Sequence, residues 1–289
     1  MSAATLAPAT VRALVAEGTR RLQQADLERP RAEASLLAGH ALGLDKTALV
    51  AHPELTAGPD QTHRYDALVE RRARGEPLAY LTGEREFYGR SFLVDRRALI
   101  PRPETELLVE TALAELSAGP TQVSIVDVGT GSGAIAATLA LELPGARVIV
   151  SDISPEALDL ARDNLGRHGL ARRVPLVRGD LLAWLRGPVD LVVANLPYVP
   201  AETFDSLPRD VREYEPRLAL DGGHGGARLL MRLLEQASRL EVGTLLAELD
   251  PRHADEVRVK AVSYFPDRPV DILQDLAGRE RLLRVGRAG

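Results

Sequence analysis

The sequence contains no cysteine among its 289 residues. Disulfide bonds, zinc sites built on thiolates and a cysteine nucleophile are therefore excluded. No stretch approaches the roughly 20 consecutive apolar residues that a membrane-spanning helix needs. The first ten residues also lack the basic start and the apolar run of a signal peptide. From these absences we expect a cytoplasmic protein that has no association with membranes.

An excess of basic residues is also missing. The sequence has 36 Lys and Arg against 41 Asp and Glu, which gives a formal net charge of -5. Proteins whose main work is to grip nucleic acid usually carry a basic excess. We therefore expect a protein or small-molecule partner and no direct contact with nucleic acid. The six histidines show no spacing typical of metal ligands, so we expect no metal site.

The hydrophobic pattern changes near residue 84 and predicts two domains. Apolar residues recur at helical spacing within residues 10–22, 32–42 and 60–74. Residues 1–80 are therefore predicted to form a small N-terminal helical bundle. Phe87 and Phe92 lie on either side of Gly89 in a strand-like pattern, which predicts a β-hairpin within a linker at residues 81–105. Residues 106–289 are predicted to form the second domain.

From residue 123 onward, short apolar strands alternate with helical segments. Strands are predicted at residues 123–128, 147–152, 174–180, 189–195, 244–249, 269–273 and 280–285, and helices at 134–143, 155–166, 227–240 and 252–264. This alternation predicts an α/β fold, in which helices cover both faces of a mostly parallel sheet. Ligands of such sheets bind beyond the carboxyl ends of the strands, where the strand order reverses.

A glycine-rich loop follows the first of these strands, with the sequence Asp127-Val-Gly-Thr-Gly-Ser-Gly133. Its spacing is Gly-x-Gly-x-Gly, whereas dinucleotide-binding folds use Gly-x-Gly-x-x-Gly. A carboxylate before the first glycine would repel a pyrophosphate, but it suits the ammonium group of a methionine moiety. The alternative is a plain strand-to-helix turn. The loop predicts a nucleotide-type cofactor site made by Asp127, Gly129, Thr130, Gly131, Ser132 and Gly133.

Two further acidic residues end the next two predicted strands. Asp152 is placed to accept hydrogen bonds from both hydroxyls of a ribose, and its alternative role is to cap the following helix. Asp180 is placed to accept from an adenine amino group while Leu181 packs on the ring, and its alternative is an ordinary turn. One cofactor that spans three neighbouring strand ends explains the glycine loop and both acids.

The fourth strand runs directly into Asn195-Leu-Pro-Tyr198. The Asn195 side-chain carbonyl and the Leu196 backbone carbonyl can accept the two hydrogens of a planar amide or aminopurine nitrogen. Pro197 stiffens the turn, and Tyr198 offers an aromatic face to a flat substrate group. The alternative is a proline turn with a packed tyrosine. A nicotinamide oxidoreductase would have no role for this motif, and a non-catalytic cofactor-binding module would not need it.

At these residues the chain resembles the release factor glutamine methyltransferases, HemK-like protein-(glutamine-N5) methyltransferases of the class I S-adenosylmethionine enzymes. Further matching segments are Gly75-Glu-Pro-Leu-Ala-Tyr-Leu-Thr-Gly83, Arg85-Glu-Phe-Tyr88, Leu99-Ile-Pro-Arg-Pro-Glu-Thr-Glu106 and Glu215-Pro-Arg-Leu-Ala-Leu-Asp-Gly-Gly223. The resemblance implies a Rossmann-like fold with a seven-stranded sheet and a helical N-terminal domain that recognises the substrate. It further implies a monomer that turns S-adenosylmethionine into S-adenosylhomocysteine.

The substrate implied by the resemblance is the glutamine in the Gly-Gly-Gln loop of peptide chain release factors, the proteins of translation termination. By position, Asn195 belongs to the cofactor site as well as to the glutamine site, together with Leu196, Pro197 and Tyr198. The resemblance places Phe87, Arg102, Pro103 and Thr105 in the walls of the site, with Phe87 beside the cofactor.

The chain departs from the family at one position of its catalytic motif. Leu196 stands where the family motif Asn-Pro-Pro-Tyr has its first proline. The acceptor carbonyl belongs to the backbone and survives this change, although a proline no longer stiffens that position. Asn-Leu-Pro-Tyr is the form found in enzymes similar to the ribosomal RNA adenine dimethylases. Glutamine of a ribosomal protein and an adenine amino group of RNA or DNA therefore stay open as alternative substrates.

Overall fold

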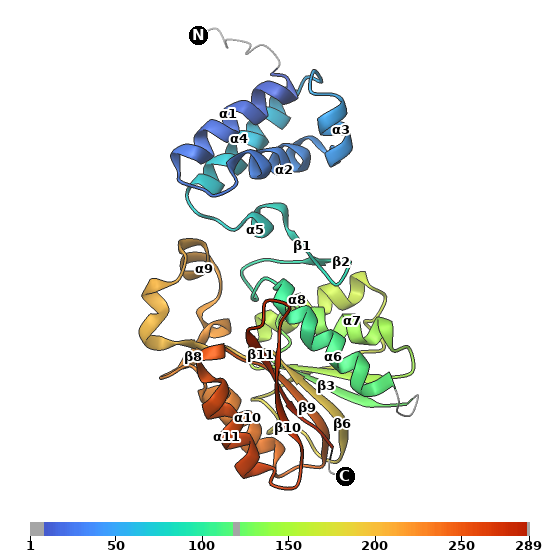
Figure 1. Ribbon diagram of the computed structural model, residues 1–289. Coiled ribbons are helices and arrows are strands. Elements are labelled where there is room, and N and C mark those ends of the chain that lie inside the picture. The colour runs from blue at the N-terminus through green and yellow to red at the C-terminus, as the bar shows by residue number, and fades with distance from the viewer. Residues whose placement is uncertain (1–8, 118–121, 288–289) are drawn as a thin grey trace. The chain divides into compact units, whose positions relative to one another are not determined.

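The computed structural model describes residues 9–117 and 122–287 (Figure 1). It divides the chain into two compact units. The first holds Met1–Gly83 together with Arg209–Tyr214, and the second holds Glu84–Pro208 and Glu215–Gly289. The prediction that the chain lacks a signal peptide concerns the first ten residues, of which 1–8 lie outside the described residues. No helix in the described part combines the length and the apolar character needed to cross a membrane.

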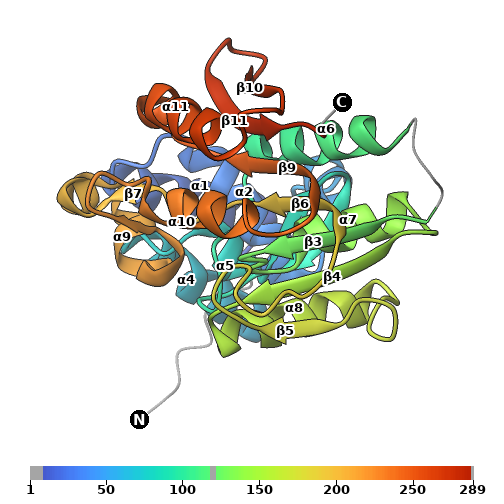
Figure 2. The same ribbon diagram turned by 90° about the horizontal axis from the view of Figure 1, so that it is seen from below.

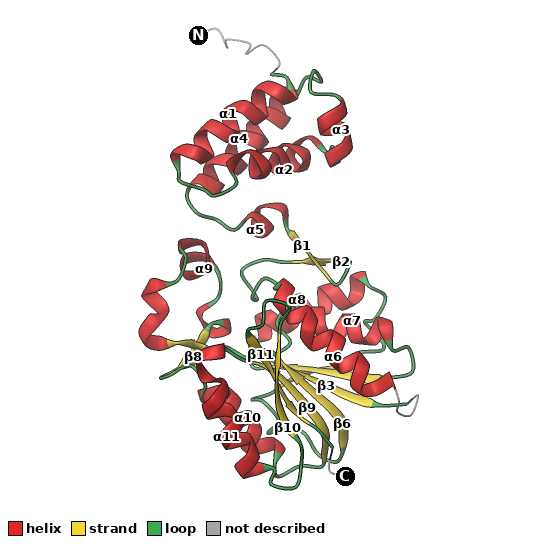
Figure 3. Ribbon diagram, in the orientation of Figure 1, coloured by secondary structure: helices red, strands yellow, loops and turns green. Residues whose placement is uncertain are grey.

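The first unit is helical (Figure 3). Its core contains Leu22, Leu37 and Val69, which are all fully buried, and Tyr65. The longest helices correspond to the three predicted ones, whereas the short helices α3, α5 and α9 were not predicted. The bounds are α1 Val11–Gln24, α2 Pro30–Leu42, α3 Lys46–Ala51, α4 Pro59–Ala73, α5 Leu78–Thr82 and α9 Arg209–Tyr214.

The second unit is built on a seven-stranded sheet in the order β10-β11-β9-β6-β3-β4-β5 (Figure 2). Strand β11 is antiparallel to β10 and β9, and the remaining neighbours pair in parallel. The predicted mostly parallel sheet of an α/β fold is thereby confirmed. The strands are β3 Ser124–Val128, β4 Arg147–Asp152, β5 Leu176–Arg178, β6 Val189–Ala194, β9 Val242–Glu248, β10 Val270–Gln274 and β11 Glu280–Val285.

Helices cover both faces of this sheet because successive strand residues point to opposite sides. Ile125 and Val193 lie in the core formed with α6 and α7, and Val126 and Val192 in the core formed with α10 and α11. The strands buried on both faces therefore read as continuous apolar runs. The helices are α6 Glu106–Ser117, α7 Ala134–Glu142, α8 Pro155–Arg167, α10 Arg228–Ala237 and α11 Ala254–Tyr264.

The β-hairpin consists of β1 Glu84–Phe87 and β2 Arg90–Leu93 and belongs to the second unit. Asn164 of α8 fixes it, because its side chain accepts from the Leu93 amide (2.7 Å) and donates to the Leu93 carbonyl (3.0 Å). The side-chain nitrogen of Asn164 also donates to the Ser132 carbonyl (2.9 Å). One buried side chain thus ties the hairpin to the glycine loop.

Candidate functional site

A cavity of about 660 Å³ lies at the carboxyl ends of β3, β4 and β6, where the fold predicts a ligand. This volume falls in the range of small-molecule sites. Ile153 and Leu218 give it apolar walls and are half exposed, although neither was predicted. The predicted site residues that line the cavity are Gly129, Gly131, Asp152, Asp180, Leu181, Asn195, Leu196 and Pro197.

The glycine loop and the Asn-Leu-Pro-Tyr motif touch at Gly129. Its φ is +71°, and a Cβ atom added there would lie 2.9 Å from the Leu196 Cδ2 atom. Leu196 is buried, so it has little room to move away. A side chain at position 129 would therefore push the cofactor loop and the catalytic motif apart.

Asp127 lies behind the glycine loop and does not line the cavity. It is fully buried, and its Oδ2 atom accepts a hydrogen bond from the Thr130 hydroxyl (2.6 Å). Its other oxygen, Oδ1, is buried with no hydrogen-bond partner in the structure. The pKa of the Asp127 carboxyl is raised to about 7, chiefly by burial; the Thr130 bond and the nearby Ala136 amide lower it, and the charge of Asp152 adds to the rise. An unpaired buried carboxylate oxygen is costly unless a donor reaches it.

The two other strand-end acids differ in their surroundings. Asp152 lines the cavity and also makes two turn contacts, because it accepts from the amides of Gly131 (3.0 Å) and Ser154 (2.9 Å). Burial raises the pKa of the Asp152 carboxyl, and these backbone bonds oppose the shift. Asp180 also lines the cavity, but Arg232 of α10 holds one of its oxygens at 2.6 Å. Asp180 therefore has one unshared oxygen for a ligand.

Asn195 follows β6 and is joined to three other polar side chains. Its side-chain nitrogen donates to the Thr105 hydroxyl (3.0 Å), which donates to the Glu248 carboxylate (2.7 Å). The Tyr198 hydroxyl lies 3.4 Å from the other oxygen of Glu248. Glu248 was not predicted, although it ends a buried strand as Asp152 does. Burial raises the pKa values of Tyr198 and Glu248.

The remaining predicted wall residues do not line the cavity. Arg102 pairs with the buried Glu215, which also accepts the Ile100 amide (3.1 Å), and Pro103 opens the short 3-10 helix Pro103–Thr105. Phe87 is only 1% exposed and packs edge-on against Phe92 at 6.3 Å in the core. Its large apolar ring belongs to the hydrophobic interior, so Phe87 is not part of the cavity wall.

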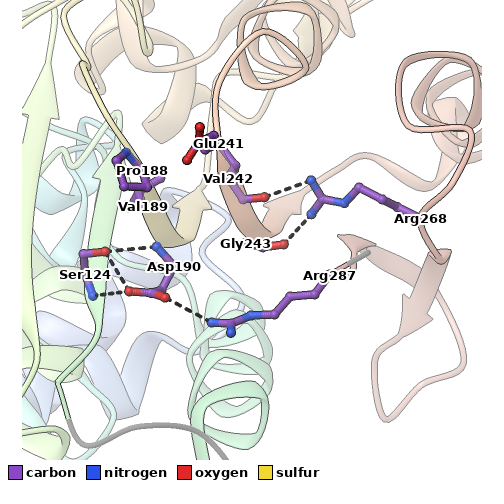
Figure 4. A pocket seen from close by; sticks show the side chains of 9 residues that line it. All are labelled: Ser124, Pro188, Val189, Asp190, Glu241, Val242, Gly243, Arg268 and Arg287. Atoms are coloured by element: carbon purple, nitrogen blue, oxygen red, sulfur yellow. Dashed lines mark hydrogen bonds and ion pairs between the residues drawn. The ribbon is translucent and has the colours of Figure 1, made fainter. Parts of the chain in front are cut away.

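A second cavity, of about 440 Å³, lies at the opposite ends of the strands (Figure 4). Its polar side chains other than Glu241 are bonded to other groups of the protein. Arg268 donates to the backbone carbonyls of Val242 and Gly243, and Asp190 accepts from the Ser124 hydroxyl (2.8 Å) and from Arg287 (3.3 Å). Because these side chains already bind backbone groups at the strand ends or each other, we place the ligand site in the first cavity.

Comparison with known proteins agrees with this arrangement. Residues 13–83 match the family described as PrmC N-terminal domain, and residues 125–214 match the methyltransferase domain family. A release factor glutamine methyltransferase of Moorella thermoacetica is 45% identical over 275 residues, or 94% of this chain and 96% of the relative. A release factor glutamine methyltransferase of Deinococcus radiodurans is 41% identical over 281 residues, which cover 96% of this chain and 99% of the relative.

Among solved structures, a methyltransferase from Pyrococcus furiosus shares the fold, with a TM-score of 0.51 and 16% identity over 78% of this chain and 98% of that chain. The identity with the two curated relatives extends over nearly the whole of each chain. This chain therefore belongs to the release factor glutamine methyltransferase family.

Proposed function

We propose that this protein transfers a methyl group from S-adenosylmethionine to the side-chain amide nitrogen of a glutamine in the Gly-Gly-Gln loop of peptide chain release factors. The observation that carries the proposal is the position of Asn195. It lines the same cavity as the glycine loop and Asp152, at the end of the neighbouring strand β6. A substrate amide at Asn195 is thereby brought next to a cofactor held by the loop.

The cavity fits S-adenosylmethionine in three respects. The buried Oδ1 atom of Asp127 lacks a donor, and because Asp127 does not itself line the cavity, the ammonium group reaches it through a bridging water molecule. Asp152 has lone pairs left for the ribose hydroxyls, since each carboxylate oxygen accepts more than one hydrogen bond. Ile153 and Leu218 offer apolar surface to a base, with Leu181 and the unshared oxygen of Asp180 close by.

The residues of the chain act mainly by positioning the substrate. The bound cofactor supplies an electrophilic methyl group on its sulfonium sulfur. The Asn195 side-chain carbonyl and the Leu196 backbone carbonyl accept the two amide hydrogens, so the nitrogen turns its lone pair toward the methyl carbon. When bound, the cofactor would donate its methyl group to this nitrogen and leave as S-adenosylhomocysteine, and the methylated nitrogen would release one proton to solvent. Tyr198 stacks on the flat amide and Pro197 holds the turn. Such positioning alone accounts for large rate effects.

We further propose that residues 1–80 recognise the release factor and that the protein acts as a cytoplasmic monomer without direct contact to nucleic acid. The net charge of -5 supports a protein substrate. A helical unit with its own core supports a separate recognition domain.

The test is to incubate the protein with labelled S-adenosylmethionine and, in separate reactions, a release factor, ribosomal proteins and RNA. The modified residue is then mapped by mass spectrometry. Methylation of the Gly-Gly-Gln glutamine is the expected result. A release factor whose glutamine is replaced by alanine is the matched control and should stay unlabelled. Label in RNA or in a ribosomal protein, with none in the release factor, would overturn the proposal.

A further inference from the structure

We infer that Glu248 is a positioning residue that, acting through Thr105, sets which face of the Asn195 amide is turned to the substrate. This inference rests on the proposed function, because it concerns how the substrate amide is oriented. Glu248 is the last residue of β9, and Asn195 follows the last residue of β6. The two strands are parallel neighbours with Ala194 opposite Ala247, so Asn195 and Glu248 are adjacent in register.

The direction of the hydrogen bonds follows from counting donors. The Thr105 hydroxyl donates its single proton to Glu248 Oε2 at 2.7 Å, the only direction that an ionised Glu248 allows, because a carboxylate can only accept. The Thr105 oxygen then has only lone pairs to offer to Asn195. It must accept from the Asn195 amide nitrogen, which lies 3.0 Å away. The Asn195 side-chain carbonyl is consequently left for a ligand.

The opposite orientation of Asn195 is unfavourable with this arrangement. Turning the amide over would place its carbonyl oxygen against the Thr105 oxygen, whose proton is already given to Glu248. Two acceptors would then face each other in a buried setting, since Thr105 is 3% and Glu248 5% exposed. A turned amide would also present hydrogens to a substrate amide that itself has hydrogens to donate.

The carboxylate is held in place from several sides. Tyr198, the aromatic residue of the motif, directs its hydroxyl to the second Glu248 oxygen at 3.4 Å. Burial raises the pKa of Glu248, whereas the Thr105 bond and the charge of Arg281 lower it. Glu248 thus contacts two residues that flank the substrate position without lining the main cavity itself.

The test uses the full-length protein and single substitutions that remove or restore one bond. Glu248→Ala and Thr105→Val should each lower kcat at saturating cofactor on the order of 10- to 100-fold, the range expected for a misplaced reacting group. The KM for S-adenosylmethionine should stay within about twofold of the wild type, because neither residue lines the cofactor cavity. Thr105→Ser keeps the hydroxyl and should restore most of kcat. Glu248→Gln keeps an acceptor but adds a donor, so its kcat should fall between wild type and Glu248→Ala.

Asp190→Asn is the matched control for Glu248→Gln. Asp190 also accepts from a hydroxyl, that of Ser124, but at the opposite end of the sheet (Figure 4). Its kcat should equal that of the wild type. The double variant of Glu248→Ala with Thr105→Val should be no worse than either single variant, since both remove the same constraint. Additive losses, or Thr105→Ser as damaging as Thr105→Val, would overturn the inference.

A readout that needs no substrate separates this inference from the proposed function. In nitrogen-15 NMR spectra of the wild type, one side-chain amide proton of Asn195 should exchange slowly with water, and Glu248→Ala should abolish this protection. Unchanged protection in that variant overturns the inference whatever the enzyme methylates. A wild type that leaves release factors unmodified overturns the proposed function, and the NMR comparison still decides the orientation of Asn195.

Discussion

The backbone amide of Gly131 donates a 3.0 Å hydrogen bond to the side chain of Asp152. The glycine loop after β3 and the end of β4 are therefore tied together through the acid that we propose to bind the ribose. Loss of this carboxylate affects the cofactor in two ways, because a ligand acceptor disappears and the loop amide is left unpaired.

Asp152→Ala should therefore weaken the binding of S-adenosylmethionine at least tenfold, as measured by isothermal titration calorimetry. Hydrogen bonds to a charged acceptor contribute about 1.5–3 kcal/mol each, and about 1.4 kcal/mol corresponds to a factor of ten. Asp152→Asn keeps an acceptor for the Gly131 amide, so its affinity for S-adenosylmethionine should lie between those of the wild type and Asp152→Ala. Wild-type affinity in the alanine variant would refute the ribose assignment.

Cofactor binding should also depend on pH through Asp127. Its pKa is raised to about 7 in the free protein, so the carboxyl is mostly neutral at pH 6 and becomes ionised as the pH rises. A cationic ammonium group binds the ionised form better, and binding should release a proton. The affinity should increase about five- to tenfold from pH 6 to 7.5, a range in which an α-amino group is mostly protonated.

The control for this pH dependence is Asp127→Asn, which has no titrating carboxyl. Its affinity should be lower at pH 7.5 and nearly flat across the same range. A wild type whose affinity falls with rising pH would show that the ammonium group is not near Asp127.

Asn195→Ala should lose on the order of 10² or more in turnover at saturating cofactor, the scale seen when one preorganised polar contact at a reacting centre is removed. Asn195→Asp keeps an acceptor and should retain more activity. Tyr198→Phe keeps the stacking face and should cost less than Tyr198→Ala. Equal damage from Phe and Ala at position 198 would instead assign the main role to the hydroxyl that points to Glu248.

Gly226 offers a test of how tightly the catalytic motif is packed. A Cβ atom there would lie 2.4 Å from the Tyr198 carbonyl oxygen, at a φ of +82°. Gly226→Ala should lower the free energy of unfolding by about 1–3 kcal/mol and reduce turnover at least tenfold, because the Tyr198 backbone must shift. Gly225 has a similar φ of +67°, but its added Cβ would meet nothing within 4 Å.

Gly225→Ala is therefore the matched control, since it shares the backbone strain without the collision. Thermal unfolding and turnover of both variants distinguish the two effects. Equal turnover in the two variants would mean that the contact with Tyr198 has no catalytic consequence.

The sheet could be predicted because its strands are short apolar runs that are followed by turn-forming or polar residues, such as Gly129, Asp152 and Asn195. Strand β5 is shorter than predicted, since only Leu176–Arg178 pair with β4. The hairpin ends at Leu93, well before the end of the predicted linker at residue 105. The bounds of a strand depend on how far its partner strand extends. This pairing cannot be predicted from the local pattern of apolar residues.

The site was less predictable where side chains from distant segments meet. Asp180 could be identified as a strand-end acid, but its pairing with Arg232, 52 residues away, could not. The resemblance predicts Phe87 in the wall of the site, whereas the structure places it in the hydrophobic core. Glu248 has the same local signal as Asp152, an acid at the end of an apolar strand, but its contact with Thr105, 143 residues away, has no local signal.

The bonds around Asn195 also bear on the order in which the enzyme becomes competent during synthesis. Asn195 and Thr105, which are joined by a hydrogen bond, lie 90 residues apart in the chain. Thr105 and Glu248, which are joined by the next bond, lie 143 residues apart. Such distant pairs close late, because loop closure must precede them. A nascent chain that ends before β9 has the glycine loop and Asp152 but lacks the acceptor that orients Asn195. In the mechanism that we propose, the exit of Glu248 from the ribosome thus converts a chain that has only the cofactor segments into one that can position a glutamine.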